Sequence, residues 1–262
     1  MNRECGKAWR YAAVPDRKEH KVTGVLGRVA GLPQTIYRVG YKLTVARRRY
    51  GRGEGYDAAA YWGDRFRRYG TSLRGPGHEG MSEAENREMY EQAGRDFTGF
   101  CVDHGVAFLG RRVLEIGCGT GFFTDLIWKM GPPREFVGVD VTDVQFEGIR
   151  KRHPEAKLRQ GDITTRLDDL GQFDVVVMID VVQHIVTQSG FDGMIENVRR
   201  VLAPGAAFLV SPVAESARKE LFYVRWWLPR AFRDALPGFD FVANTDFRGM
   251  QLFLIQSPLS GD

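Results

Sequence analysis

The sequence predicts an α/β protein built around a doubly wound parallel sheet, with a helical extension before it. Two observations support this class. From residue 112 onward, short apolar runs of strand length alternate with helical patterns, which is typical of a parallel sheet covered by helices. The first apolar run also leads into a glycine-rich turn and a helix start, at 113–127. The sheet domain is therefore expected over 111–262.

The strands follow one another in regular order. Their expected ranges are 112–117, 135–140, 156–160, 173–179, 206–212, 239–244 and 249–256. Helices are expected at 122–131, 143–152, 189–202 and 216–235. Pro229 is expected to kink or stop the last helix. The last two strands are close enough in the sequence to form a hairpin.

A helical cap is predicted before the sheet, over 56–110. Tyr56–Phe66 has the composition of a short aromatic helix, and a glycine-rich loop follows it. Ser82 and Glu85 have the spacing of a capping box, which predicts that a second helix begins there and runs to about Val102.

The first 55 residues form a basic arm, 1–55. Residues 1–53 hold 13 Lys and Arg against 3 Asp and Glu, a net charge of +10, whereas the remainder carries −6. Apolar residues at helical spacing end at Pro33, and a second set runs from Ile36 to Leu43. Such an arm can contact an anionic membrane, but charge runs more often lie on a solvated face. We therefore favour an arm that packs on its own domain or on a partner subunit, which leaves a homodimer open.

Composition narrows the class of protein further. The chain has 262 residues, 43% of them hydrophobic, enough for one α/β domain with a sizeable core. Cys5, Cys101 and Cys118 give neither a disulfide framework nor metal-ligand spacing, so no metal site is expected. No apolar run reaches the length of a membrane span, and the N-terminus lacks the apolar core of a signal peptide. These features favour a cytoplasmic setting.

The most informative segment is Glu115–Gly121, in which an acid is followed by glycine at every second position. Glycines let a ligand approach the backbone closely, and an acid at the strand end suits an ammonium group better than a phosphate. The spacing departs from the Gly-x-Gly-x-x-Gly fingerprint of nicotinamide-dependent oxidoreductases. It resembles instead the first motif of class I methyltransferases, Glu/Asp-x-Gly-x-Gly-x-Gly, which use S-adenosylmethionine (SAM).

Four further segments follow in the order of that family. Phe136–Asp140 predicts a second strand that ends in an acid, about 20 residues after the glycine turn. Leu158–Ile163 resembles the third motif, Phe173–Asp180 the fourth, and Val201–Val210 the helix, loop and strand after it. The resemblance covers 113–210. It implies a Rossmann-like doubly wound sheet of seven strands, mostly parallel with an antiparallel last strand.

The resemblance also implies a set of cofactor contacts. Glu115 would face the methionine end of SAM, Asp140 the ribose hydroxyls and Asp162 the adenine, while Asp180 would lie near the methyl group. A single such acid is often only a turn or cap residue. That interpretation is weaker here, because open α/β sheets place ligands at the carboxyl ends of their strands. The predicted cofactor-binding residues are Glu115, Gly117, Cys118, Gly119, Gly121, Asp140, Val141, Asp162, Ile163 and Asp180.

His184 is the candidate general base. It follows the fourth motif by four residues, an unperturbed imidazole titrates near neutrality, and many small-molecule methyltransferases have a histidine at a similar place. A histidine that packs against adenosine or orders the loop is the alternative. Aromatic segments before and after the motifs resemble those that close over the acceptor in this class. The predicted substrate and lid residues are Tyr61, Trp62, His78 and Trp226, with His78 as the reserve base.

The sequence therefore predicts a SAM-dependent methyltransferase that acts on a hydroxyl of a small-molecule metabolite or sugar, similar to bacterial enzymes of saccharide and secondary-metabolite pathways. The segment after Asp180 lacks the Asn/Asp-Pro-Pro-aromatic pattern of base-amino methyltransferases, so a nucleic-acid partner is not favoured. Two alternatives stay open. One is an RNA or protein methyltransferase that uses the basic arm, and the other is a non-methylating SAM-binding protein on the same fold.

Overall fold

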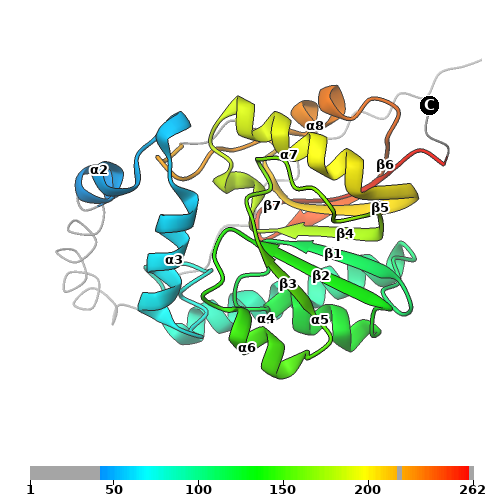
Figure 1. Ribbon diagram of the computed structural model, residues 1–262, viewed down its shortest axis with the longest axis horizontal. Helices are drawn as coiled ribbons and strands as arrows, with labels where there is room; N and C mark the ends of the chain where they lie inside the picture. The colour runs from blue at the N-terminus through cyan, green and yellow to red at the C-terminus, as the bar shows by residue number, and fades with distance from the viewer. Residues whose placement is uncertain (1–41, 217–219, 260–262) are drawn as a thin grey trace, which may run out of the picture. The chain divides into compact units, whose positions relative to one another are not determined.

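A seven-stranded sheet organises the protein in the computed structural model, which describes residues 42–216 and 220–259 (Figure 1). The strand order is β3-β2-β1-β4-β5-β7-β6. Neighbouring strands are parallel except where β7 pairs antiparallel with β5 and β6. The predicted mostly parallel sheet with an antiparallel last strand is confirmed. The strands are β1 Arg112–Ile116, β2 Glu135–Asp140, β3 Lys157–Gln160, β4 Phe173–Ile179, β5 Leu202–Val213, β6 Asp240–Phe247 and β7 Met250–Gln256.

Helices cover both faces of this sheet, α7 and α8 one face and α4, α5 and α6 the other (Figure 1). Because both faces are covered, the central strands are apolar at nearly every position rather than at alternate ones, as in β4. The helices are α2 Arg47–Tyr50, α3 Ala58–Tyr69, α4 Glu83–Asp103, α5 Phe122–Met130, α6 Phe146–Arg152, α7 Gln188–Val201 and α8 Pro229–Ala235, with short turns at Lys42–Ala46, Gly53–Gly55 and Val182–His184.

The helix predicted to begin at Ser82 is confirmed as α4. The Ser82 hydroxyl accepts a hydrogen bond from the Glu85 N–H, and the Glu85 carboxylate accepts one from the Ser82 N–H, at 3.2 and 2.6 Å. The capping box therefore fixes the start of the helix. From that start α4 runs along the sheet and buries Tyr90, Phe97 and Phe100 against it.

The helix predicted over 216–235 is wrong in its first part, because α8 covers only Pro229–Ala235 and residues 220–228 are not helical. Pro229 begins the helix instead of stopping it, since the first helical position needs no N–H donor. The preceding Trp227 is fixed by two contacts to residues far away in the sequence. Its indole Nε1 donates to the Ile185 carbonyl at 2.9 Å, and its ring stacks on Phe191 at 4.0 Å. Tertiary contacts have overridden the helical pattern here.

The described end of the basic arm, from residue 42 onward, belongs to the same compact unit as the sheet. Tyr50, the last residue of α2, packs edge-on against Tyr61 of α3 with ring centroids 5.3 Å apart, and Tyr61 stacks on Tyr223 at 4.9 Å. This contact joins the arm's last residues to the cap. The apolar patterns predicted before residue 42 lie outside the described residues. Within 42–216 and 220–259, no helix has the length and apolar character needed to cross a membrane.

Candidate cofactor and acceptor site

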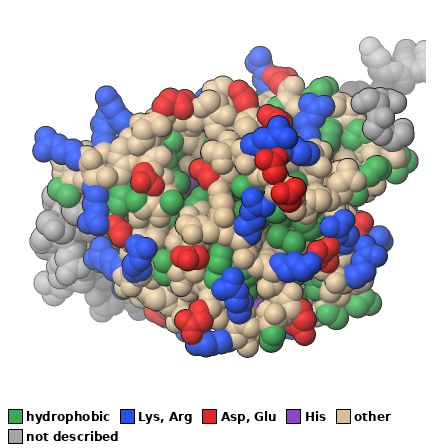
Figure 2. Space-filling model, viewed as in Figure 1, with side chains coloured by type: hydrophobic (Ala, Val, Ile, Leu, Met, Phe, Trp, Pro, Cys, Tyr) green, Lys and Arg blue, Asp and Glu red, His purple; other side chains and the backbone are tan. Residues whose placement is uncertain are grey.

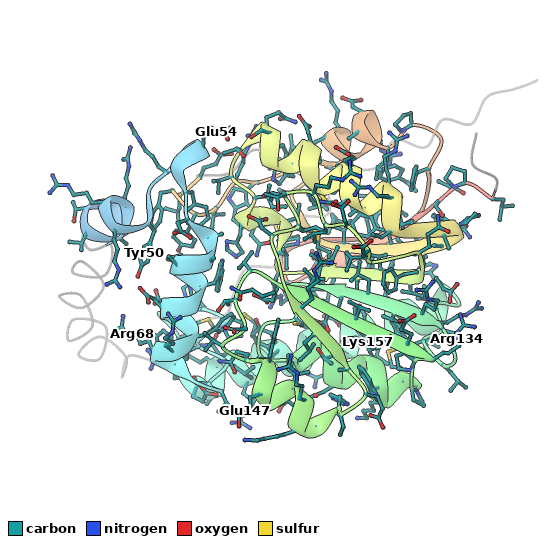
Figure 3. The ribbon with its side chains drawn as sticks, in the orientation of Figure 1. Tyr50, Glu54, Arg68, Arg134, Glu147 and Lys157 are labelled. Atoms are coloured by element: carbon teal, nitrogen blue, oxygen red, sulfur yellow. The ribbon has the colours of Figure 1, made fainter. Side chains whose placement is uncertain are left out.

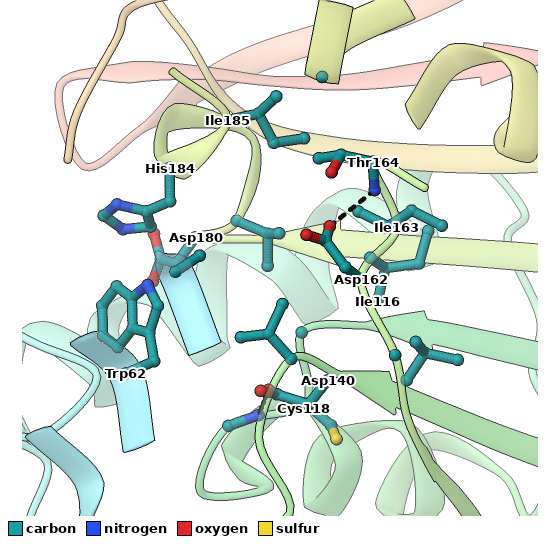
Figure 4. Close-up of a pocket in the computed structure, with 18 of the residues that line it drawn as sticks. Trp62, Ile116, Cys118, Asp140, Asp162, Ile163, Thr164, Asp180, His184 and Ile185 are labelled. Atoms are coloured by element: carbon teal, nitrogen blue, oxygen red, sulfur yellow. Dashed lines mark hydrogen bonds between the residues drawn. The ribbon is translucent and has the colours of Figure 1, made fainter. Parts of the chain in front are cut away.

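A cavity of about 420 Å³ lies at the carboxyl ends of β1, β2 and β4 (Figure 4). This volume is within the range of small-molecule sites, roughly 300–1,000 Å³. Its other wall is formed by Trp62 and Phe66 of α3 together with Gly53, Glu54, Tyr56 and Ala58. Glu54 lies beside the start of α7 (Figure 3), where its carboxylate accepts a hydrogen bond from the Ser189 hydroxyl at 2.9 Å. The cap therefore covers one side of the place where a parallel sheet binds ligands.

The glycine turn after β1 lines the cavity with its backbone. Gly117 and Gly119 have left-handed φ angles of 75° and 48°, which residues other than glycine adopt only with backbone strain. A Cβ atom on Gly117 would also lie 2.1 Å from Cγ2 of Val181. Glycine is needed at this position for both reasons, and it brings β1 and the end of β4 into close contact.

Asp140 ends β2 and points at the glycine turn. Its carboxylate accepts hydrogen bonds from the N–H groups of Gly119 and Thr142, at 2.9 and 3.1 Å. Burial raises the pKa of Asp140 to about 6, although these backbone hydrogen bonds act in the opposite direction. Above that pH the side chain is a fixed, ionised hydrogen-bond acceptor on the cavity wall.

Asp162 and Ile163 lie in the loop after β3. The Asp162 carboxylate accepts a hydrogen bond from the Thr164 N–H at 2.8 Å (Figure 4). Ile163 is buried, and its carbonyl accepts from the Asn197 side chain of α7 at 2.7 Å. The loop is therefore held rigidly and offers an acid beside an apolar surface.

His184 lies at the other end of the cavity, in the turn after β4. Its Nδ1 is 2.8 Å from the Tyr223 carbonyl oxygen. A carbonyl can only accept, so Nδ1 must donate, and in the neutral ring Nε2 carries the lone pair. The Trp62 ring meets the imidazole edge-on at 4.7 Å (Figure 4). The imidazole is thus fixed in tautomer and orientation, as a proton acceptor must be.

The cavity brings together ten of the residues singled out from the sequence, and five others lie outside its lining. Those that line it are Trp62, Gly117, Cys118, Gly119, Asp140, Val141, Asp162, Ile163, Asp180 and His184. Those outside the lining are Tyr61, His78, Glu115, Gly121 and Trp226. Gly121 is instead the residue before α5, with a φ of 84°.

Glu115 lies within β1 and is only 3% exposed. Its carboxyl group accepts a hydrogen bond from the Thr124 hydroxyl of α5 at 2.5 Å. Burial raises the pKa of Glu115 to about 8, the Thr124 hydrogen bond lowers it, and nearby Asp140 raises it further. In the structure this acid joins β1 to α5, behind the cavity wall.

Several lining residues were not singled out individually by the sequence, although Tyr56 and Phe66 belong to the aromatic segment that it marks. Phe66 and Tyr90 come from the cap helices α3 and α4, and Glu54 and Tyr56 from the segment before α3. Aromatic residues at helical spacing are normally core residues, so only the packing of these helices over the sheet reveals their second role. Among the described residues, no group of three or more His, Cys, Asp or Glu side chains could hold a metal ion.

The segment that forms most of this cavity is similar to known proteins. Residues 113–205 match the family model described as a methyltransferase domain. A probable SAM-dependent methyltransferase of Mycolicibacterium smegmatis is 36% identical over 102 residues, which are 39% of this chain and 38% of that protein. A ubiquinone biosynthesis O-methyltransferase of Mesorhizobium japonicum is 26% identical over 133 residues, 47% of this chain and 51% of that protein. The chain thus matches about half or less of these relatives' length.

Solved structures share the fold. The N-methyltransferase NodS of Bradyrhizobium japonicum aligns with a TM-score of 0.53 and 17% identity over 64% of this chain and 97% of that one. The [4+2]-cyclase SpnF aligns with a TM-score of 0.52 and 17% identity over 63% of this chain and 81% of that one. The same fold therefore carries both methyl transfer and a different reaction.

The chemistry of the cavity fits SAM. Asp140 is an ionised acceptor suited to hydroxyl donors, and Asp162 beside Ile163 suits a flat ring with an amino group. Gly117 and Gly119 of the glycine turn line the same cavity as Asp140 and Asp180. These carboxylates are acceptors of the kind that ribose hydroxyls and an adenine amino group would need.

Proposed function

We propose that this chain, which contains a class I methyltransferase domain with SAM as the cofactor of its class, transfers a methyl group to a hydroxyl of a small-molecule acceptor. The observation that carries the proposal is one cavity between the sheet and the cap, with two chemically different sides (Figure 4). Asp140 and Asp162 line one end, and His184 and Trp62 line the other. A cofactor at the first end would present its reactive group to an acceptor at the second.

Bound SAM supplies an electrophilic methyl group on a positively charged sulfur. The protein's part is to hold the acceptor oxygen in line and to exclude water. Positioning of this kind can lower a barrier by about 7–11 kcal/mol, whereas a general base contributes about 10²–10⁴ in rate. The cap helices are therefore as important to the proposed reaction as any base.

His184 is the proposed base. Because Nδ1 donates to the Tyr223 carbonyl, Nε2 is the nitrogen with a lone pair. The acceptor hydroxyl would give its proton to Nε2 as its oxygen gains the methyl group. The methyl–sulfur bond would break with its electron pair left on sulfur, and the imidazolium would later release the proton to water. The Tyr223 carbonyl stabilises the imidazolium, since a proton on both nitrogens keeps the Nδ1 hydrogen bond.

Two alternatives remain to be tested. A macromolecular substrate would need a surface that attracts it, but basic and acidic side chains are interspersed over the face shown in Figure 2. A reaction other than methylation is the second alternative, because SpnF, which has the same fold, is a [4+2]-cyclase.

The decisive experiment is to incubate the protein with methyl-labelled SAM and a host extract separated by size. Label in the low-mass fraction supports the proposal and allows the product to be identified. Label in a fraction sensitive to ribonuclease or protease would replace the small molecule with a macromolecule. No label in either fraction, with SAM bound, would favour a non-methylating role. The Asp140→Ala variant is the control that ties any label to this cavity.

A further inference from the structure

Two residues near the acceptor end have left-handed backbones without being glycine. Asp180, directly after β4, has a φ of 61°, and Arg248, in the turn between β6 and β7, has a φ of 56°. Asp tolerates this conformation, but an unbranched charged side chain such as arginine seldom adopts it. Gly249 follows with a φ of 72°, so the turn is of the kind that Asn-Gly forms without strain. An asparagine would suit this backbone better than Arg248.

The Arg248 side chain gives a reason for this choice. It forms an ion pair with the Asp180 carboxylate, across the sheet and 68 residues away in sequence. Both side chains are mostly buried, at 20% and 18% exposure. The guanidinium also lies over the Tyr90 ring, 5.4 Å from its centroid. Burial alone would lower the pKa of Arg248, but the Asp180 carboxylate raises it above its ordinary value. The guanidinium therefore stays charged.

Asp180 and Tyr90 line the cavity, whereas Arg248 lies behind them. The Tyr90 hydroxyl donates to the second Asp180 oxygen at 3.5 Å. Burial, and next the charge of Asp180, raise the pKa of Tyr90, so the phenol keeps its proton. A carboxylate has about four lone-pair positions. After the contacts to Arg248 and Tyr90, it can still accept a hydrogen bond from a ligand.

We propose that Arg248 is a positioning residue that fixes and charge-balances Asp180, so that the acceptor end takes a neutral hydroxyl-bearing molecule. A hydroxyl would donate to the carboxylate without disturbing the ion pair. An ammonium would compete with the Arg248 guanidinium for the Asp180 carboxylate, and an acceptor carboxylate would have no hydrogen to donate to it. This inference rests on the proposed function, whose acceptor it restricts to uncharged hydroxylated compounds.

A stability cycle tests the ion pair without any acceptor. Arg248→Asn relieves the turn but leaves the Asp180 carboxylate without its partner, so we expect a lower Tm. Asp180→Asn combined with Arg248→Asn removes both charges and relieves the turn, so its Tm should return at least to the wild-type value. Asp169→Asn, at another left-handed position outside the cavity lining, is the matched control. If Arg248→Asn alone raises Tm as much as the control does, the proposal is overturned.

Methyl transfer tests the positioning role. With the labelled extract, the wild type should label low-mass compounds that pass both anion and cation exchangers. Arg248→Asn should reduce that label about 10²-fold, while the affinity for S-adenosylhomocysteine, measured by calorimetry, stays within about 3-fold. Arg248→Lys, which keeps the charge, should recover part of the loss.

Two results would contradict the inference. One is wild-type label held mainly on an ion exchanger, and the other is undiminished label with Arg248→Asn. A wild type that labels nothing would contradict the proposed function instead, and the stability cycle would then decide alone whether Arg248 holds Asp180.

Discussion

At the scale of single residues, the buried acid Glu115 shows what the sequence can and cannot predict about the site. The resemblance predicts that Glu115 faces the cofactor, whereas in the structure its carboxyl group accepts a hydrogen bond from the Thr124 hydroxyl of α5. The sequence could mark Glu115 as unusual, because an acid in an apolar strand needs a partner. The sequence could not show which partner Glu115 has. Thr124 lies on the next element, and a side-chain hydroxyl can donate a hydrogen bond to a carboxyl group as well as a ligand can.

The raised pKa of Glu115 makes stability depend on pH. The ordinary pKa is 4.5 and the folded value is about 8, so the folded state binds this proton more tightly. The stabilising effect of this proton is complete below pH 4.5 and is lost as pH rises toward 8, by about 1.4 kcal/mol per pH unit.

We expect Glu115→Gln to be more stable than the wild type at pH 8 and similar to it at pH 5. Thermal denaturation across this range checks it, with the exposed Glu147→Gln as control. Parallel pH profiles for the wild type and Glu115→Gln would refute the assignment.

His184 carries the proposed proton transfer. We expect His184→Ala to reduce turnover about 10²–10⁴-fold while the affinity for S-adenosylhomocysteine changes little. The measurement is the initial rate of methyl transfer together with calorimetric binding. His153, which contacts Asp125 at 2.7 Å and lies outside the cavity lining, provides the control as His153→Ala. Unchanged turnover in His184→Ala would remove His184 from the base role.

At the scale of elements, the glycine turn is the most constrained part of the site. Gly117→Ala would place a Cβ 2.1 Å from Val181 and strain a φ of 75°. We expect a clear loss of Tm and of cofactor binding, of which Val181→Ala in the same chain restores only part, because the backbone strain remains. Gly99→Ala, in α4 with nothing within 4 Å of the new Cβ, should instead stabilise by about 0.5–1 kcal/mol. Equal changes in Tm for Gly117→Ala and Gly99→Ala would contradict this prediction.

The strands and α4 could be predicted from the sequence because their signals are local: apolar runs bounded by turns, and a capping box. The segment 220–228 could not, since its aromatic residues are held by partners far away in the chain, as Trp227 is by Ile185. The same reason hides the pairing of Arg248 with Asp180. A charged residue in a hairpin turn is ordinary, and only the folded sheet brings it behind the cavity.

At the scale of the whole molecule, charge distinguishes the two classes of substrate. The basic arm gives residues 1–53 a net charge of +10, but the acceptor site proposed here is a cavity between the sheet and the cap. Turnover of a small neutral acceptor should therefore change little between 50 and 200 mM salt, whereas RNA binding through several phosphate contacts would weaken by about 10³–10⁵. Labelling rates at the two salt concentrations decide between them, and a steep fall would favour the macromolecule.

The central claim is that this cavity holds the S-adenosyl group, and calorimetry with S-adenosylhomocysteine tests it most directly. We expect the wild type to bind at pH 7.5, and Asp140→Ala to lose about 10-fold or more, because a charged hydrogen bond contributes about 1.5–3 kcal/mol. Affinity should also fall as pH drops through 6, where Asp140 gains a proton. Asp143→Ala, close in sequence but outside the cavity lining, should bind like the wild type. Absence of wild-type binding, or equal binding by Asp140→Ala, would contradict the claim.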